Sequence, residues 1–141
     1  MSRIARTVLI AAVLIVAGLA DVSAVGNLAT RPTNLPPLVF DANLNFSVKE
    51  YKIETGKFYR WQIESKGGDE FALFAPELWR NSWVDQVVIN KIEIKAQNPY
   101  SFEFDKEGVV EVTFLPIRPG RYPYWIKGYE QRGMAGVFIV D

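Results

Sequence analysis

Apolar and polar residues alternate in short runs along most of the chain after residue 37, and each run is as long as a typical β-strand. The apolar positions of these runs are Phe46, Val48, Tyr51 and Ile53; Tyr59, Trp61 and Ile63; Phe71 and Leu73; Ile92 and Ile94; Tyr100, Phe102 and Phe104; Val110, Val112 and Phe114; and Val137 to Val140. Turn-forming residues separate the runs, as at Thr55-Gly56, Asn98-Pro99 and Pro119-Gly120. Many short strands with regular turns predict an all-β sandwich or barrel.

One stretch departs from this alternation. In Pro76 to Val88 (PELWRNSWVDQVV), the proline suits a first helical position, and Trp79 and Trp83 are four residues apart. We expect a helical turn or short helix there.

The first 37 residues have a different composition. Arg3 and Arg6 precede 13 apolar residues, Val8 to Ala20, and Val22-Ser23-Ala24 has the small residues of a signal-peptidase site. Residues 1–24 are therefore either a cleaved signal peptide or an uncleaved hydrophobic helix that anchors the chain in the inner membrane. In both cases the rest of the chain lies on the periplasmic side. Residues 25–37 contain three prolines and are expected to be a tether to a domain spanning residues 38–141.

Composition excludes several functions. The chain has no Cys and no His, so it lacks the usual general base of a Ser-His-Asp triad and the commonest ligands of zinc and copper. Lys and Arg equal Asp and Glu at 16 each, and no basic run follows residue 6, which argues against nucleic acid as a partner. No phosphate-binding loop or cofactor fingerprint is present, so we expect no enzyme.

The C-terminal part of the chain resembles the bacterial cupredoxins. The resemblance is carried by Pro119-Gly120-Arg121-Tyr122-Pro123-Tyr124-Trp125, followed after a loop by Gly133-Met134-Ala135-Gly136 and a last strand. In that family a Pro-Gly-x-Tyr turn leads into a strand that ends at a ligand Cys, a His follows, and Gly-Met-x-Gly supplies the axial Met. Asp69-Glu70-Phe71 stands where related domains have His-Glu-Phe. The resemblance covers about residues 38–141 and implies a Greek-key β-sandwich.

The same resemblance implies that the copper site is lost. Ile126 takes the position of the Cys, Tyr129 that of the second His, and Asp69 (or Glu70, with a shift of one residue) that of the first His. Only Met134 is kept. Because a blue-copper site needs a thiolate and two imidazoles, we expect no copper and no other cofactor.

Two groups of residues are candidates for binding. Asp69, Glu70 and Met134 are weak metal-ligand candidates, since a lone thioether binds weakly and a turn carboxylate is usually solvated. Six aromatic residues are candidates for partner binding, or alternatively belong to the core: Tyr122, Tyr124, Trp125, Tyr129, Trp79 and Trp83. Charged residues expected around the same end, as a solvated or docking rim, are Arg118, Arg121, Lys127, Glu130 and Arg132, with Gln131.

These features predict a non-catalytic, copper-free cupredoxin-like protein on the periplasmic face of the inner membrane. It would be an accessory or stabilising subunit of a membrane protein complex, in a respiratory or photosynthetic electron-transfer assembly. The alternative is a soluble periplasmic metal-binding or metal-handling protein with a non-blue site.

Overall fold

A computed structural model describes residues 30–141 of the chain. The predicted signal peptide or anchor, residues 1–24, and the first part of the predicted tether lie outside the described residues. No helix in residues 30–141 is long and apolar enough to cross a membrane.

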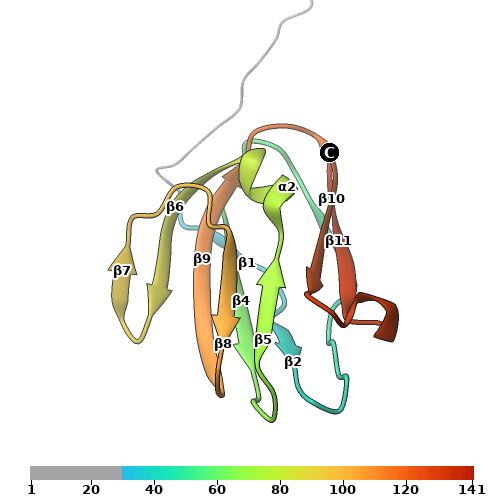
Figure 1. The fold of residues 1–141 in the computed structure, drawn as a ribbon. Helices are drawn as coiled ribbons and strands as arrows, with labels where there is room; N and C mark the ends of the chain where they lie inside the picture. Colours follow the sequence, from blue (N-terminus) through green and yellow to red (C-terminus); the bar gives the residue numbers. More distant parts are fainter. Residues whose placement is uncertain (1–29) are drawn as a thin grey trace, which may run out of the picture.

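The described residues form two β-sheets packed face to face, with a short helix at one end (Figure 1). The first sheet has the order β1-β4-β9-β6-β7, with β2 also paired to β4, and the second has the order β3-β11-β10-β5-β8. The strands of the first sheet are β1 (Thr33–Asn34), β2 (Leu38–Phe40), β4 (Tyr59–Ser65), β6 (Ser82–Ile89), β7 (Ile92–Ile94) and β9 (Gly108–Pro116). Those of the second are β3 (Glu50–Ile53), β5 (Phe71–Phe74), β8 (Ser101–Phe104), β10 (Gly120–Ile126) and β11 (Ala135–Val140). The prediction of an all-β sandwich with one short helix is confirmed.

The helix is shorter than the stretch in which it was expected. Helix α2 covers Pro76–Arg80, and β6 begins two residues later, so Trp79 is helical and Trp83 is in a strand. The alternation of β6 is hidden in the sequence because its register with β9 shifts between Val84 and Gln86, as at a β-bulge. The extra residue at a bulge shifts the following apolar residues to the other parity, so the sequence of the strand shows no regular alternation across it.

The sandwich begins within the segment that was predicted to be a tether. Thr33 and Asn34 pair in parallel with Tyr59 and Arg60 of β4, and the Leu35 amide donates to the Arg60 carbonyl at 2.9 Å. The Pro36 carbonyl accepts a 2.9 Å hydrogen bond from the Tyr51 hydroxyl. Residues 33–36 are therefore bound to the sheets.

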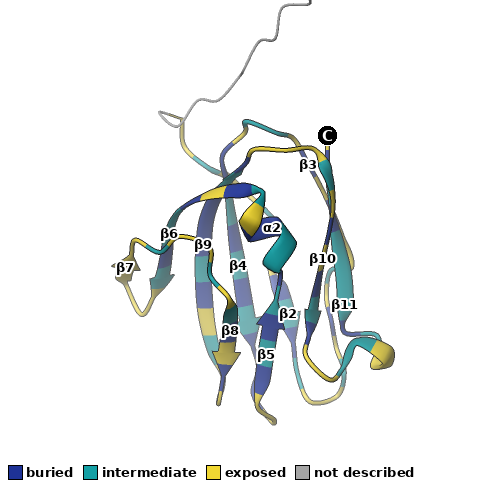
Figure 2. Ribbon diagram, turned by 45° about the horizontal axis from the view of Figure 1, so that its top comes forward, coloured by how far each residue is buried: buried dark blue, intermediate teal, exposed yellow. Residues whose placement is uncertain are grey.

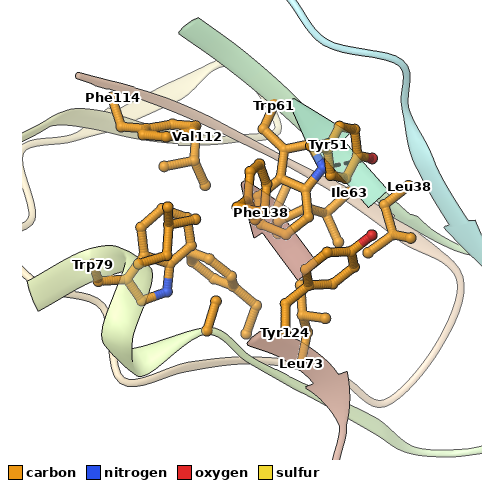
Figure 3. Packing of buried hydrophobic residues seen from close by; sticks show 14 of the residues in the cluster. Leu38, Tyr51, Trp61, Ile63, Leu73, Trp79, Val112, Phe114, Tyr124 and Phe138 are labelled. Carbon is orange, nitrogen blue, oxygen red and sulfur yellow. Dashed lines mark hydrogen bonds between the residues drawn. The ribbon is translucent and has the colours of Figure 1, made fainter. Parts of the chain in front are cut away.

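Buried residues lie along the strands of both sheets (Figure 2), and aromatic rings among them fill the space between the sheets (Figure 3). Trp61 lies at the centre, with ring contacts to Tyr51, Trp79, Tyr124 and Phe138. The Trp61 indole N–H donates to the Tyr51 hydroxyl at 3.0 Å. Burial raises the pKa of Tyr51 to about 12, so this hydroxyl stays protonated at neutral pH.

We expect residues 30–141 to fold on their own, with a cooperative thermal transition and a β-type circular dichroism spectrum, because the core is complete within them. A chain that starts at Leu38 should also fold but melt at a lower temperature, since it lacks β1 and the carbonyl that accepts from Tyr51. Equal melting temperatures would show that β1 contributes nothing to stability, and an aggregated 30–141 product would contradict an independent domain.

Candidate functional site

By the resemblance stated above, the loop between β10 and β11 takes the place of the metal-binding loop of the cupredoxins. It lies at the end of the sandwich opposite to that at which the described part of the chain begins (Figure 1). A short 3-10 helix, η1 (Glu130–Arg132), forms its tip and ends at Gly133, whose φ of 91° is left-handed. The Ile126 amide donates to the Met134 carbonyl at 2.9 Å, and the Met134 amide donates to the Tyr129 carbonyl at 3.2 Å. These bonds bring together Ile126, Tyr129 and Met134, the three loop residues that the resemblance places at ligand positions.

A hydrogen bond between side chains closes this loop onto the turn before β5. The Tyr129 hydroxyl donates to Oδ2 of Asp69, and Oδ1 of Asp69 accepts from the Glu70 amide at 2.9 Å. The Tyr129 bond lowers the pKa of Asp69, and the same bond raises the pKa of Tyr129. Asp69 is therefore ionised and Tyr129 protonated at neutral pH, which is the state that keeps this bond.

Two further contacts hold the Tyr129 ring. The Phe71 ring meets it edge-on with centroids 5.6 Å apart, and the Arg132 guanidinium lies 5.1 Å from its centroid. Phe71 is fully buried, and Arg132 belongs to η1. Tyr129 thus packs between the core and the loop tip.

The other two residues expected at ligand positions, Ile126 and Met134, are in the core. Ile126 and Met134 have no exposed surface, so the Met134 sulfur lies among apolar side chains. Asp69 and Glu70 are exposed, and no group of three His, Cys, Asp or Glu side chains within residues 30–141 is arranged to hold a metal ion. The residues present do not fit the copper that the fold family implies, because neither a thiolate nor an imidazole stands at any ligand position.

The six candidate aromatic residues divide between the core and the surface. Tyr124, Trp79 and Tyr122 are buried, and the two tyrosine hydroxyls donate to backbone carbonyls, Tyr124 to Val48 at 2.7 Å and Tyr122 to Arg118 at 2.9 Å. These three residues are therefore structural. Trp125 and Tyr129 are half-buried, and Trp83 is 38% exposed. They are the candidates that keep accessible surface.

A partly exposed row of aromatic rings lies on the outer face of the second sheet, and the sequence analysis identified only one of its members as a binding candidate. Trp125 stacks on Phe74 with centroids 5.9 Å apart, and Phe74 meets Tyr100 edge-on at 5.3 Å. Tyr100 is 76% exposed, and the Lys127 ammonium lies 5.9 Å from the Phe74 centroid. We call Trp125, Phe74 and Tyr100 the aromatic strip. Phe74 stands out of phase with the buried Phe71 and Leu73, and this was the signal in the sequence for an outward-facing ring.

The expected charged rim is divided between the two ends of the molecule. Lys127, Glu130 and Arg132 flank the loop, but Arg118 and Arg121 lie where β10 begins. A seven-residue strand is about 23 Å long. The expectation of a single rim was wrong because β10 separates the two groups by the height of the sandwich.

Solved structures with a similar fold include an auracyanin and several multicopper oxidases. Auracyanin from the photosynthetic bacterium Roseiflexus castenholzii matches with a TM-score of 0.52 and 17% identity, over 79% of this chain and 99% of that one. A laccase-like multicopper oxidase from an Ochrobactrum species matches with a TM-score of 0.60 and 9% identity, over 82% of this chain and 32% of that one. A multicopper oxidase from Campylobacter jejuni matches with a TM-score of 0.55 and 10% identity, over 79% of this chain and 30% of that one.

These likenesses show a cupredoxin-like fold, and the chain spans 30% to 46% of the length of the multicopper oxidases named among its matches. No protein-family model matches the sequence, and a search of curated proteins finds no match either. The resemblance to a cupredoxin without its Cys and His ligands is confirmed at the level of the fold. A fold by itself does not assign an activity.

Proposed function

We propose that this chain is a non-catalytic, copper-free cupredoxin-like subunit that stabilises a membrane complex at the periplasmic face of the inner membrane. The complex would be a respiratory or photosynthetic electron-transfer assembly, held through the N-terminal segment and the domain surface. One observation carries the proposal: two ligand positions of the copper-binding relatives hold Asp69 and Tyr129, which bond to each other. The fold is kept, and its metal end is closed by bonds within the chain.

Burial at the other two positions supports the same proposal. Ile126 and Met134 complete the core, so this end contributes packing where a cupredoxin has copper. The auracyanin neighbour comes from a photosynthetic bacterium, which favours an electron-transfer assembly as the setting. The alternative, a metal-handling protein, would require Asp69 to give up the Tyr129 hydroxyl and Met134 to leave the core. The geometry favours the structural role.

The aromatic strip is the surface that we assign to the partner, together with Tyr129 on the neighbouring loop. Its rings are already ordered against one another, so docking costs little side-chain entropy. Trp and Tyr, two of the three rings in the strip, are enriched among the residues that dominate binding energy.

The test of this function is affinity purification of the tagged chain from native membranes, with the intact mass of the recovered chain. We expect defined membrane subunits to co-purify and the mass to include residues 1–24. A chain recovered alone, as a processed soluble protein with bound metal, would favour the alternative.

Trp125→Ala and Tyr129→Ala should each weaken association with the complex by about 1–4 kcal/mol where the ring is a buried anchor. Both side chains are half-buried, so each variant should still fold, and Tyr129→Ala should melt at a lower temperature than the wild-type chain because it loses the bond to Asp69 and the contact with Phe71. Co-purified subunits, quantified at equal bait, measure the effect. Ile92→Ala is the matched control, because Ile92 is 65% exposed on β7, away from the strip. Wild-type recovery with both Trp125→Ala and Tyr129→Ala would show that this surface is not the interface.

A further inference from the structure

The end of the domain at which residue 30 lies has an exposed surface of its own. The turn before β10 places Ile117 and Arg118 at its tip, and both are exposed, Ile117 to 57%. Backbone hydrogen bonds fix this turn among its neighbours: the Ile117 amide donates to the Asn81 carbonyl at 2.8 Å, and the Gly56 amide donates to the Pro116 carbonyl at 2.9 Å. We call Arg31, Lys57, Ile117, Arg118 and Arg121 the tether end.

An aromatic residue stands beside this surface. Trp83 is the second residue of β6, is 38% exposed and has its ring centroid 6.1 Å from that of Phe58. Phe58 in turn bonds through its carbonyl to the Thr33 amide at 2.8 Å, next to the point where the described chain starts. Exposed Trp and aliphatic side chains beside basic residues are typical of surfaces at the membrane–water interface.

The charges of the tether end are predominantly positive. Two of its neighbouring acidic residues are neutralised, since Glu54 pairs with Lys57 at 3.2 Å and Glu77 pairs with Arg80 at 2.8 Å. No ion pair within residues 30–141 involves Arg31, Arg118 or Arg121. One further carboxylate, that of Asp141, lies at this end and belongs to neither of the two ion pairs. Three arginines are thus available for an external anion.

The membrane anchor of the proposed function limits how far this surface can lie from a bilayer. The 13 apolar residues Val8 to Ala20 are separated from Thr30 by nine residues. Nine residues reach at most about 32 Å even when fully extended, so a bilayer that holds the apolar segment lies close to the tether end. The loop with Tyr129 and Asp69 is at the opposite end of the sandwich (Figure 1).

We propose that the tether end docks on the anionic headgroup surface of a phospholipid bilayer. Ile117 enters the interface, Arg31, Arg118 and Arg121 contact lipid phosphates, and Trp83 lies at headgroup level. This inference rests on the membrane attachment in the proposed function. It adds an orientation, in which the domain stands on the membrane with its former metal end directed away.

The absence of Cys allows a direct test with a single spin label. The full chain with Ile117→Cys is labelled and reconstituted in vesicles of phosphatidylglycerol and phosphatidylcholine, and electron paramagnetic resonance measures collisions with oxygen and with a water-soluble nickel chelate. Lys106→Cys, in the exposed turn before β9, is the control at the opposite end. We expect the Ile117 label to be shielded from the nickel chelate and exposed to oxygen, and the Lys106 label to show the reverse.

Charge dependence separates docking from anchoring. Arg118→Gln and Arg121→Gln in the Ile117→Cys chain should each lower the docked-to-undocked ratio about fivefold, and high salt should have a similar effect. Pure phosphatidylcholine vesicles should leave the label in water. An Ile117 label as accessible to nickel as the Lys106 label in anionic vesicles would overturn the proposal. Because these vesicles contain no partner subunit, that failure would leave the co-purification test of the proposed function unaffected.

Discussion

The triple variant Asp69→His, Ile126→Cys and Tyr129→His should bind Cu(II) and show an intense blue absorption band. With Met134 these substitutions restore two imidazoles, a thiolate and a thioether, which is the donor set of a blue-copper site. The backbone of the loop already brings Ile126, Tyr129 and Met134 together, and Tyr129 reaches Asp69. The wild-type chain should hold no stoichiometric copper, because the band requires a copper–thiolate bond and the chain has no Cys.

The matched control for this experiment is Asp69→His with Tyr129→His, which supplies the imidazoles without the thiolate. It should bind Cu(II) without the blue band. Absorption spectra and metal content, measured after removal of unbound copper, distinguish the three chains. A folded triple variant without the band would show that the loop geometry departs from that of the copper-binding relatives, and it would remove the basis for aligning Asp69 and Tyr129 with ligand positions.

The sequence predicted strands such as β4, β5 and β8 because buried residues alternate in them with less buried ones. In β4, buried Tyr59, Trp61 and Ile63 alternate with less buried residues, as the pattern indicates. In β6 the register shift after Val84 destroys that period, so the strand was missed. Strand β1 consists of two exposed residues that pair with β4 through the backbone. Their side chains show no apolar alternation, so the sequence pattern does not predict this strand.

The division of the aromatic residues depends on three-dimensional contacts that the pattern does not contain. Tyr124 and Trp125 are consecutive, so one must point inward and the other outward, yet both side chains suit either side. The inward direction of Tyr124 depends on Gly136. A Cβ at residue 136 would lie 2.4 Å from the Tyr124 ring, so the ring occupies space that only a glycine leaves open. The Asp69–Tyr129 bond joins residues 60 apart in the chain, and only the family resemblance placed them at one site.

Trp79→Ala should lower the free energy of unfolding by about 3–5 kcal/mol, while Trp83→Ala should change it by less than about 1 kcal/mol. The sequence presents the two tryptophans as equivalent candidates for an interface. In the structure Trp79 is 1% exposed, with ring contacts to Trp61, Phe102 and Phe114, so its truncation leaves a cavity that fixed neighbours cannot fill. Trp83 is 38% exposed, and water replaces much of what its ring covers.

Urea unfolding of residues 30–141, followed by far-ultraviolet circular dichroism, measures both changes without relying on tryptophan emission. Trp79→Phe is an additional variant that keeps an aromatic ring and should lose less stability than Trp79→Ala. If Trp79→Ala does not fold, Trp79→Phe still allows the comparison, because its loss in free energy of unfolding should exceed that of Trp83→Ala. Equal losses at positions 79 and 83 would contradict the placement of Trp79 on the inner side of α2. A large loss of stability with Trp83→Ala and none with Trp79→Ala would contradict the structure, in which Trp79 is in the core and Trp83 is on the outer face of β6.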